Sequence, residues 1–338
     1  MVASLLSVAP SGIPEPFLRA ESTAGKFFLM FFAVAFFAAV FGLVLFLASL
    51  LKGKRGEQGQ GMLFAAPAVL LLAVGLLYPA VLTIIQSLRG KSGDGAFSFE
   101  NYSAMFSQPE LLTVLRNTAL WVILVPFLAT AIGLLYAILI DRARGEAFAK
   151  ALIFLPMAIS MVGASIIWKF VYQYKQTERP QIGLLNQLFK LVGLETQQFL
   201  LEAPLNTLML IIVMVWIQAG FAMTVLSAAI KAIPDDIIEA ARLDGVSGFR
   251  MFRYITLPSI RAAVVVVLTT IGIGTLKVFD IVRTMTGGQF DTSVVANEFY
   301  NQSFRYNAPG LGAALAVLLF VLVIPIVAYN IVQMRKEA

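Results

Sequence analysis

The chain of 338 residues contains no cysteine and no histidine. The absence of cysteine excludes disulfide bonds and thiolate chemistry, and it carries no information about the redox compartment. Without histidine, no imidazole is present to ligate a metal or to transfer protons near neutral pH. Charged residues are scarce as well: they make up 13% of the chain, whereas a soluble domain is about one quarter charged. We therefore expect no metal site, and the low charge is unlike that of a soluble domain.

Hydrophobic residues are abundant instead. They make up 59% of the sequence, and the mean hydropathy is +0.85, as expected for an integral membrane protein. The net charge of +6 requires no nucleic-acid partner, because cytoplasmic loops of membrane proteins accumulate Lys and Arg. A secretory signal peptide is not expected, because Pro10, Pro14 and Pro16 interrupt the first 26 residues, which lack a sustained apolar core.

Seven apolar stretches meet or approach the length of about 20 helical residues that a bilayer core requires. We therefore expect an all-α, polytopic membrane protein. Prolines within several stretches predict kinks in a bundle, because neighbouring helices satisfy the carbonyl groups that a proline frees. The predicted spans are Phe27–Leu51, Met62–Leu88, Thr118–Ile140, Ala151–Val171, Leu205–Ile230, Ala262–Phe279 and Leu311–Val332.

These spans divide the chain into a peripheral part and a core. Residues 1–26 are expected to form a poorly ordered tail. The phenylalanine-rich stretch 27–51 is expected to be a peripheral, lipid-facing helix on a flexible tether, because the segment 52–61 that follows it is rich in glycine. The other six spans then form a transmembrane core over residues 62–334.

The loops predict the orientation of the chain. If residues 231–261 are cytoplasmic, then residues 52–61, residues 141–150 and the C-terminal tail are cytoplasmic too, and the N-terminus is outside. The basic residues of segment 52–61 abut a helix end, as the positive-inside rule expects. An even number of spans, with the N-terminus inside, is the alternative if part of residues 1–26 crosses the membrane.

The polar segment 231–261 has the pattern of two short helices separated by a glycine. Pro234 pre-sets a helical first turn, and Asp235 favours the positive end of the helix dipole. Gly245 is the expected stop, because glycine adopts the left-handed conformation at little cost. Ser247 can cap the second helix. We predict a short helix on the membrane surface that a soluble partner can grip and move.

The spacing within this segment resembles the EAA loop of the membrane subunits of binding-protein-dependent ABC importers. The resemblance implies a permease subunit that couples to ATP hydrolysis in a separate subunit. By that resemblance Glu239 is the acidic contact to the ATPase and Gly245 is the hinge or stop. The alternative is a surface helix in which Glu239 pairs with Arg242. The coupling positions are Asp235, Glu239, Ala240, Ala241, Arg242, Asp244, Gly245, Ile255, Leu257 and Pro258.

The resemblance also implies a set of partners. They are a second homologous permease, two copies of an ATP-binding subunit and an extracytoplasmic sugar-binding protein, assembled in the bacterial inner membrane. The chain itself has no nucleotide site. Gly90-Lys91-Ser92 imitates the end of a P-loop, but Ile85 stands where the first glycine is required. We therefore expect no bound cofactor and no enzymatic activity here, with ATP and Mg²⁺ on the partner subunit.

A second region is similar to sugar-importer permeases, and most similar to α-glucoside permeases of the maltose-permease type. It comprises Thr275–Gly288, Thr292, Tyr300 and Gly310–Ala314. The resemblance extends over residues 60–338 and implies a sugar as the transported solute. It departs from the maltose permease in one place, since Arg89–Leu112 is too short for the large external domain of that protein.

Polar residues within the spans are the candidate sugar contacts, because intramembrane polar groups usually face the bundle interior. The alternative role for each is an interhelical hydrogen bond. Two of the candidates, residues 216 and 218, lie about 200° apart around a helix, so only one faces the cavity, and we expect the amide to do so. The candidates are Trp216, Gln218, Asn206, Thr224, Thr269, Thr270 and Thr275.

Three charges lie at or just after the end of the sixth span. Asp280 with Lys277 or Arg283 is expected to form a structural or gating cluster near the outer end.

Other classes of transporter agree less well with the sequence. A secondary transporter requires a coupling carboxylate within a span, and none of the seven stretches has one deep inside. A permease for glycerol phosphate, polyamine or amino acid is the serious alternative, although the spans offer neither the basic nor the acidic residues that the first two solutes require.

Overall fold

The computed structural model describes residues 23–50, 54–141, 143–176 and 180–337. Within these ranges the regular structure is helical, apart from an isolated bridge between Arg89 and Phe97. The predicted all-α class is therefore confirmed. The chain forms two compact units, residues 1–81 and 82–338.

The first unit contains α2 (Thr23–Leu50), α3 (Lys54–Leu72) and η3 (Ala73–Leu77), and it ends within α4 (Tyr78–Ser87). The flexible tether expected over residues 52–61 is wrong where the structure describes it, because α3 is helical from Lys54. The side-chain amide of Gln60 donates to the carbonyl of Ala48 on α2 at 3.0 Å. Most of the tail 1–26 lies outside the described residues.

The π-turn η3 has a local cause in the sequence. Pro79 has no N–H, and its ring clashes with the carbonyl of the residue four positions earlier in a regular helix. A π-turn ends two residues before Pro79, with the Tyr78 N–H donating to the carbonyl of Ala73, five residues back. The helix therefore accommodates the proline by widening one turn.

In the second unit, four long helices match predicted spans. They are α6 (Pro109–Ile140), α10 (Leu205–Lys231), α14 (Arg261–Leu276) and α17 (Pro309–Glu337). The first of these begins nine residues before the predicted Thr118, because Pro109 provides a favourable first helical residue. Five described helices of the chain are long and apolar enough to cross a membrane, or up to seven if each of two bent pairs is one span.

The span predicted over Ala151–Val171 is broken by a sharp bend. This segment is α7 (Glu146–Phe154), η4 (Leu155–Ala158) and α8 (Met161–Val171), with a bend of 100°. Pro156 interrupts the helical hydrogen bonds, and the Ser160 side chain starts a new helix by accepting from the Gly163 N–H at 3.1 Å.

A second bend precedes α14. The segment consists of α12 (Gly248–Met251), η5 (Phe252–Thr256) and α13 (Leu257–Ser259), and its axis makes an angle of 70° with α14. The π-turn η5 ends just before Leu257-Pro258, as η3 ends before Tyr78-Pro79. The first bend lies at Pro156, which the sequence predicted as a kink, and the second follows Pro258, which it gave as a coupling position.

The core of the second unit forms where α6 and α10 pack together. A Cβ atom on Gly133 of α6 would lie 2.5 Å from the Cβ of Ala222 and 2.7 Å from the Met223 nitrogen. On α10, a Cβ on Gly220 would lie 2.5 Å from the Ile153 carbonyl oxygen. Small residues at these positions let the backbones approach closely, as is usual between membrane helices.

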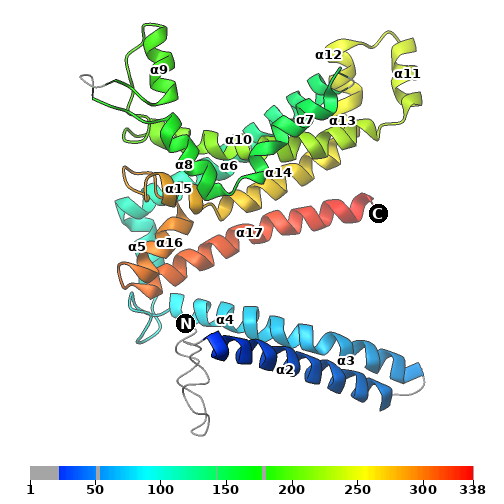
Figure 1. Cartoon of the computed structure of the whole chain (residues 1–338), viewed down its shortest axis with the longest axis vertical. Helices are drawn as coiled ribbons and strands as arrows, with labels where there is room; N and C mark the ends of the chain where they lie inside the picture. The colour runs from blue at the N-terminus through cyan, green and yellow to red at the C-terminus, as the bar shows by residue number, and fades with distance from the viewer. Residues whose placement is uncertain (1–22, 51–53, 142, 177–179, 338) are drawn as a thin grey trace. The chain divides into compact units, whose positions relative to one another are not determined.

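The two ends of this bundle differ (Figure 1). At one end lie α5 (Glu100–Ser107), α9 (Leu184–Leu191), α15 (Asp280–Met285) and α16 (Val295–Phe304). At the opposite end lie α11 (Asp235–Leu243), α12 and the end of α17. The predicted coupling loop and the C-terminus therefore lie at the same end, which we call the coupling end.

We expect Gly133→Ala to destabilise the protein by about 1–3 kcal/mol, because the added methyl overpacks the contact between α6 and α10. Gly272→Ala in α14 is the matched control, since its Cβ would meet only the Pro126 ring, at 3.8 Å. Alanine in a helix is favoured over glycine, so the control should be neutral or stabilising. Thermal unfolding in detergent measures both, and equal midpoints would contradict the packing argument.

Candidate functional site

The predicted coupling helix is present as α11 (Asp235–Leu243). Pro234 occupies the position before the helix, with ψ of 134°, so it is the N-cap and not part of the predicted first turn. Asp235 and Asp236 lie in the first turn, near the positive end of the helix dipole. The helix therefore starts as its sequence predicts, shifted by one residue.

The end of α11 is set by Gly245, which adopts a φ of +76°. Its N–H donates to the Arg242 carbonyl at 3.0 Å, and the Val246 N–H donates to the Ala241 carbonyl at 2.9 Å. These two bonds define a Schellman motif, which satisfies carbonyls that a helix end otherwise leaves free. The predicted glycine stop is thus present in the structure. The space around its Cα is open, so the backbone conformation alone requires glycine.

One side of α11 faces the bundle and the other is exposed. Ala241 is buried, and Ile238 packs partly buried against the hydrophobic core. Glu239 and Ala240 are exposed, and Leu243 has 89% of its surface exposed. Among the described residues, no ion pair joins Glu239 to Arg242. The helix therefore presents an acidic side chain and an uncovered leucine to the outside.

The second half of the loop differs from prediction in its first turn. The Ser247 side chain makes no capping hydrogen bond, and its backbone carbonyl instead accepts from the Arg250 N–H at 3.2 Å. The coupling positions at the C-terminal end lie in η5 and α13, where Ile255 and Leu257 are half-buried and Pro258 is exposed.

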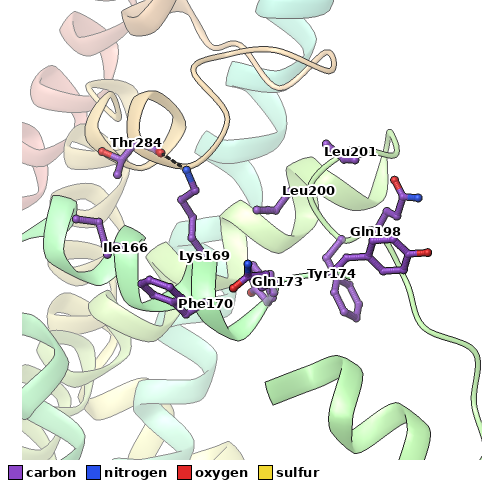
Figure 2. A pocket seen from close by; sticks show the side chains of 11 residues that line it. Ile166, Lys169, Phe170, Gln173, Tyr174, Gln198, Leu200, Leu201 and Thr284 are labelled. Carbon is purple, nitrogen blue, oxygen red and sulfur yellow. Dashed lines mark hydrogen bonds between the residues drawn. The ribbon is translucent and has the colours of Figure 1, made fainter. Parts of the chain in front are cut away.

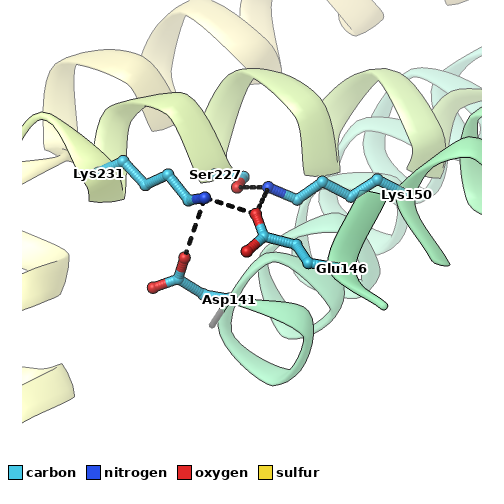
Figure 3. A network of polar contacts seen from close by, with 5 residues as sticks. All are labelled: Asp141, Glu146, Lys150, Ser227 and Lys231. Atoms are coloured by element: carbon cyan, nitrogen blue, oxygen red, sulfur yellow. Dashed lines mark hydrogen bonds and ion pairs between the residues drawn. The ribbon is translucent and has the colours of Figure 1, made fainter. Parts of the chain in front are cut away.

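The base of the coupling loop carries a charge network that the sequence analysis missed (Figure 3). Glu146, the first residue of α7, accepts from Lys150 at 2.7 Å and from Lys231 at 2.5 Å. Lys231 ends α10 and also lies 3.7 Å from the Asp141 carboxylate, while Lys150 donates to Ser227 of α10. The network ties the turn between α6 and α7 to the point where the coupling loop begins. Opposite charges at helix ends were its visible signal in the sequence.

Beneath α11 the loop is hollow. A cavity of about 560 Å³ lies between the ends of α6 and α10, the helix α11 and the turn η5. Its lining includes Asp141, Lys231, Asp235 and Arg242. The coupling helix therefore contacts the bundle through a few inward side chains, with this cavity beside them.

Trp216 and Gln218 point to different neighbours, as their separation on the helix predicts. The Trp216 ring contacts that of Trp168 on α8, with centroids 5.6 Å apart. Gln218 lies beside α14, where a Cβ on Gly274 would be 3.8 Å from its Nε2 atom. The half-buried amide makes no hydrogen bond to another described residue. Thr270 is exposed and lies one turn from Gly274 on α14, so it shares that side of the helix.

Two other sugar-contact candidates have structural roles in this conformation. Asn206 is fully buried, donates to the Phe290 carbonyl at 2.6 Å and accepts from the Thr207 N–H at 2.7 Å. Thr275 is fully buried and donates to the Ile271 carbonyl at 2.7 Å. Asn206 therefore joins α10 to loop 286–293, and Thr275 bonds within α14, so both side chains are occupied by structural contacts.

Thr224 and Thr269 donate to carbonyls of their own helices. The bond from Thr224 to the Gly220 carbonyl measures 2.9 Å, as does the bond from Thr269 to the Val265 carbonyl. Thr269 also accepts from Asn330 of α17 at 3.2 Å, which ties α14 to α17. Thr224 is exposed and remains a candidate, whereas Thr269 joins two helices.

The predicted cluster of Lys277, Asp280 and Arg283 does not form. No ion pair links them among the described residues. The Arg283 guanidinium instead lies 4.7 Å from the centroid of the Tyr300 ring and donates to Asn301 at 3.2 Å, because α16 packs beside α15 here. Asp280 occupies the first turn of α15, and Lys277 is exposed.

The end opposite the coupling helix contains a second network absent from the sequence analysis. The Asn117 side chain on α6 donates to the carbonyls of Asp291 and Ser293, at 2.5 and 3.1 Å. Asn206 of α10 holds Phe290, as described above. Phe290 and Asp291 adopt positive φ angles of 57° and 58°. Two helices therefore fix loop 286–293 in a conformation that its sequence alone does not favour.

An aromatic cavity of about 470 Å³ lies at the same end, beside α8 (Figure 2). Tyr172, Gln173, Tyr174 and Gln198 line it, and Lys169 reaches across to the Thr284 carbonyl at 3.4 Å. Tyr172 is buried and donates to the Met209 carbonyl at 3.0 Å. Burial raises the pKa of its phenol, so the group is a neutral donor at every physiological pH.

The sequence of this chain matches a known protein family. Residues 103–336 match the family described as the inner membrane component of binding-protein-dependent transport systems. The chain belongs to this family. It is a permease subunit of an ABC importer and a multi-pass inner membrane protein, so the resemblance drawn from the EAA spacing is confirmed.

Individual relatives cover most of the chain. The α-glucoside transport system permease AglF of Rhizobium meliloti is 44% identical, and the match covers 82% of each chain. The permease GgtC of Synechocystis sp., named for the uptake of osmoprotective compounds, is 42% identical over 81% of this chain and 99% of its own. A solved bacterial ABC transporter for import of the acidic polysaccharide alginate has a chain with a TM-score of 0.70 and 20% identity, covering 83% of this chain and 98% of that one. The last match shows a common fold.

We expect Gly245→Val to strain the end of α11 by about 1–3 kcal/mol, because a side chain resists the left-handed conformation. Amide hydrogen exchange at Gly245 and Val246 should then become faster, since their bonds form the Schellman motif. Gly245→Asn is the control, because asparagine tolerates positive φ. Unchanged exchange in the valine variant would contradict this role of the glycine.

Proposed function

We propose that this permease imports a neutral sugar, an α-glucoside or an oligosaccharide, into the cytoplasm, driven by ATP hydrolysis on a separate subunit. The identity of 44% to an α-glucoside permease over 82% of both chains supports the solute class. The observation that carries the coupling mechanism is α11, an exposed helix with Glu239 and Leu243 uncovered.

The coupling end faces the cytoplasm in this proposal. Glu239 makes a charge-assisted contact to the ATP-binding subunit, and the exposed side chain of Leu243 fills an apolar site on it. Movement of α11 is passed to the bundle at Lys231, where the charge network joins α10 to α6 and α7. The hollow beneath α11 leaves room for the helix to shift relative to these spans.

The sugar path runs beside α10 and α14. Gln218 supplies hydrogen bonds to sugar hydroxyls, because its amide is half-buried and has no partner among the described residues. Thr270 lies on the same side of α14 and adds a hydroxyl to this path. Trp216 stabilises the bundle through its contact with Trp168.

The partners in this proposal are a second homologous permease, two ATP-binding subunits that bind ATP and Mg²⁺, and an extracytoplasmic sugar-binding protein. A solved relative of the same fold is in complex with a periplasmic protein that carries an alginate pentasaccharide. One chain offers one coupling helix, so an ATPase dimer with two clefts requires a second permease. Active complexes that contain only this permease would favour a homodimer.

The complex reconstituted in proteoliposomes with its binding protein should hydrolyse ATP faster when maltose or trehalose is added. Glu239→Lys should abolish this stimulation or release the ATPase, because it reverses the charge at a contact worth about 1.5–3 kcal/mol. Glu195→Lys makes the same charge change at an exposed position of the opposite end and should leave the ATPase attached. Stimulation by polyamine or glycerol phosphate in place of sugar would assign a different solute, and full stimulation in Glu239→Lys would remove the docking role of α11.

Replacing Gln218 by Leu should reduce sugar transport at least tenfold, while basal ATP hydrolysis and assembly persist, because an amide that bonds the sugar is lost. Trp216→Leu should lower the thermal stability of the complex and leave transport by the assembled fraction close to normal. Uptake and unfolding midpoints of both variants test this assignment. The opposite pattern would make the indole the sugar platform.

A further inference from the structure

Beside loop 286–293 lies a polar cavity of about 620 Å³, at the end of the bundle opposite the coupling helix. We call it the acidic cavity. Its size is within the range of small-molecule sites. The first turns of α6, the loop and α16 enclose it, with polar lining from Gln108, Glu110, Gln289, Asp291, Glu298 and Gln302.

The floor of the acidic cavity is rigid. Asn117 and Asn206, on two different helices, hold the carbonyls of Phe290, Asp291 and Ser293. On the α16 side, Glu298 accepts from Gln302 at 2.7 Å and from Ser293 at 3.2 Å. These bonds fix the backbone of loop 286–293 and the Glu298 side chain before any ligand arrives, which lowers the entropy cost of binding.

Several lining side chains have no partner among the described residues. They are the amides of Gln108 and Gln289 and the carboxylates of Glu110 and Asp291. An amide offers donors and an acceptor together, and a carboxylate offers acceptors. A hydroxyl group both donates and accepts, so this set matches a ligand rich in hydroxyls.

The charge of the residues that line the cavity disfavours an anionic ligand. Among the described residues that line the cavity, three are acidic and none is Lys or Arg. A phosphate or an acidic saccharide would meet uncompensated repulsion there. At the mouth, Phe290 and Tyr306 are 47% and 62% exposed, which leaves their rings accessible to the C–H faces of a sugar.

From this geometry we propose that the acidic cavity is an acceptor site for the neutral sugar as it leaves the binding protein. The proposal rests on the function proposed above, which places this end outside the cytoplasm. A docking site for a basic side chain of the binding protein is the competing role. The unpartnered amide donors favour the sugar, because a basic side chain requires acceptors alone.

A transporter without this acceptor site should lose released sugar to the outside while still responding to its binding protein. We expect the double variant Glu110→Ala/Gln289→Ala to move about threefold less radiolabelled maltose per ATP hydrolysed, the loss that one or two hydrogen bonds produce. Stimulation of ATP hydrolysis by the sugar-loaded binding protein should stay within about twofold of wild type, because docking is unaffected.

Glu100→Ala is the matched control, since Glu100 also lies in the first turn of a helix at this end but outside the cavity. If the double variant does not assemble, the single variant Glu110→Ala tests the acceptor site. Glu110 lines the cavity but is an exposed helical residue, so its loss should not prevent folding. If the double variant moves as much maltose per ATP hydrolysed as wild type, the proposal is overturned. It is also overturned if that ratio is normal but the binding protein no longer stimulates ATP hydrolysis, which would make the cavity a docking site for the binding protein. Absence of sugar stimulation in the wild-type complex would instead refute the proposed function.

Discussion

The close contact between α6 and α10 is the constraint on which the rest of the bundle depends. Gly133 allows the two backbones to meet, and Gly220 allows the α7 backbone to pack on the other side of α10. The same two helices hold both ends of the molecule. Asn117 and Asn206 fix loop 286–293 at one end, and Asp141 and Lys231 belong to the charge network at the other. A movement of α6 relative to α10 would therefore change contacts at both ends of the bundle.

The two ends are built by different chemistry, and each suits its proposed role. Loop 286–293 is held by buried hydrogen bonds from amides to carbonyls, which are short-ranged and directional, so the loop is rigid. The coupling end is held by partly exposed ion pairs above a hollow, and such pairs are individually weak. Rigidity at one end favours recognition of a ligand, while weak contacts at the other permit a lever to move.

Local sequence signals predicted much of the coupling loop. Gly245 ends α11 as expected, because the requirement for a left-handed residue is local to the helix end. The opposite orientations of Trp216 and Gln218 followed from helical periodicity alone. Prediction failed where a contact depends on residues from another element. The expected cluster of Lys277, Asp280 and Arg283 does not form, because α16 packs beside α15. Arg283 instead contacts Tyr300 and Asn301.

The sequence by itself determined the membrane class, the approximate spans and the coupling helix, because hydropathy, proline and glycine act on their near neighbours. Tertiary structure decided which polar side chains find hydrogen-bond partners. Asn206 and Gln218 are both amides within α10, yet Asn206 is buried and bonded to loop 286–293, while Gln218 is half-buried beside α14 with no hydrogen bond to another described residue. Their difference depends on segments about sixty to eighty residues away in the chain, and only packing brings those segments to the helix.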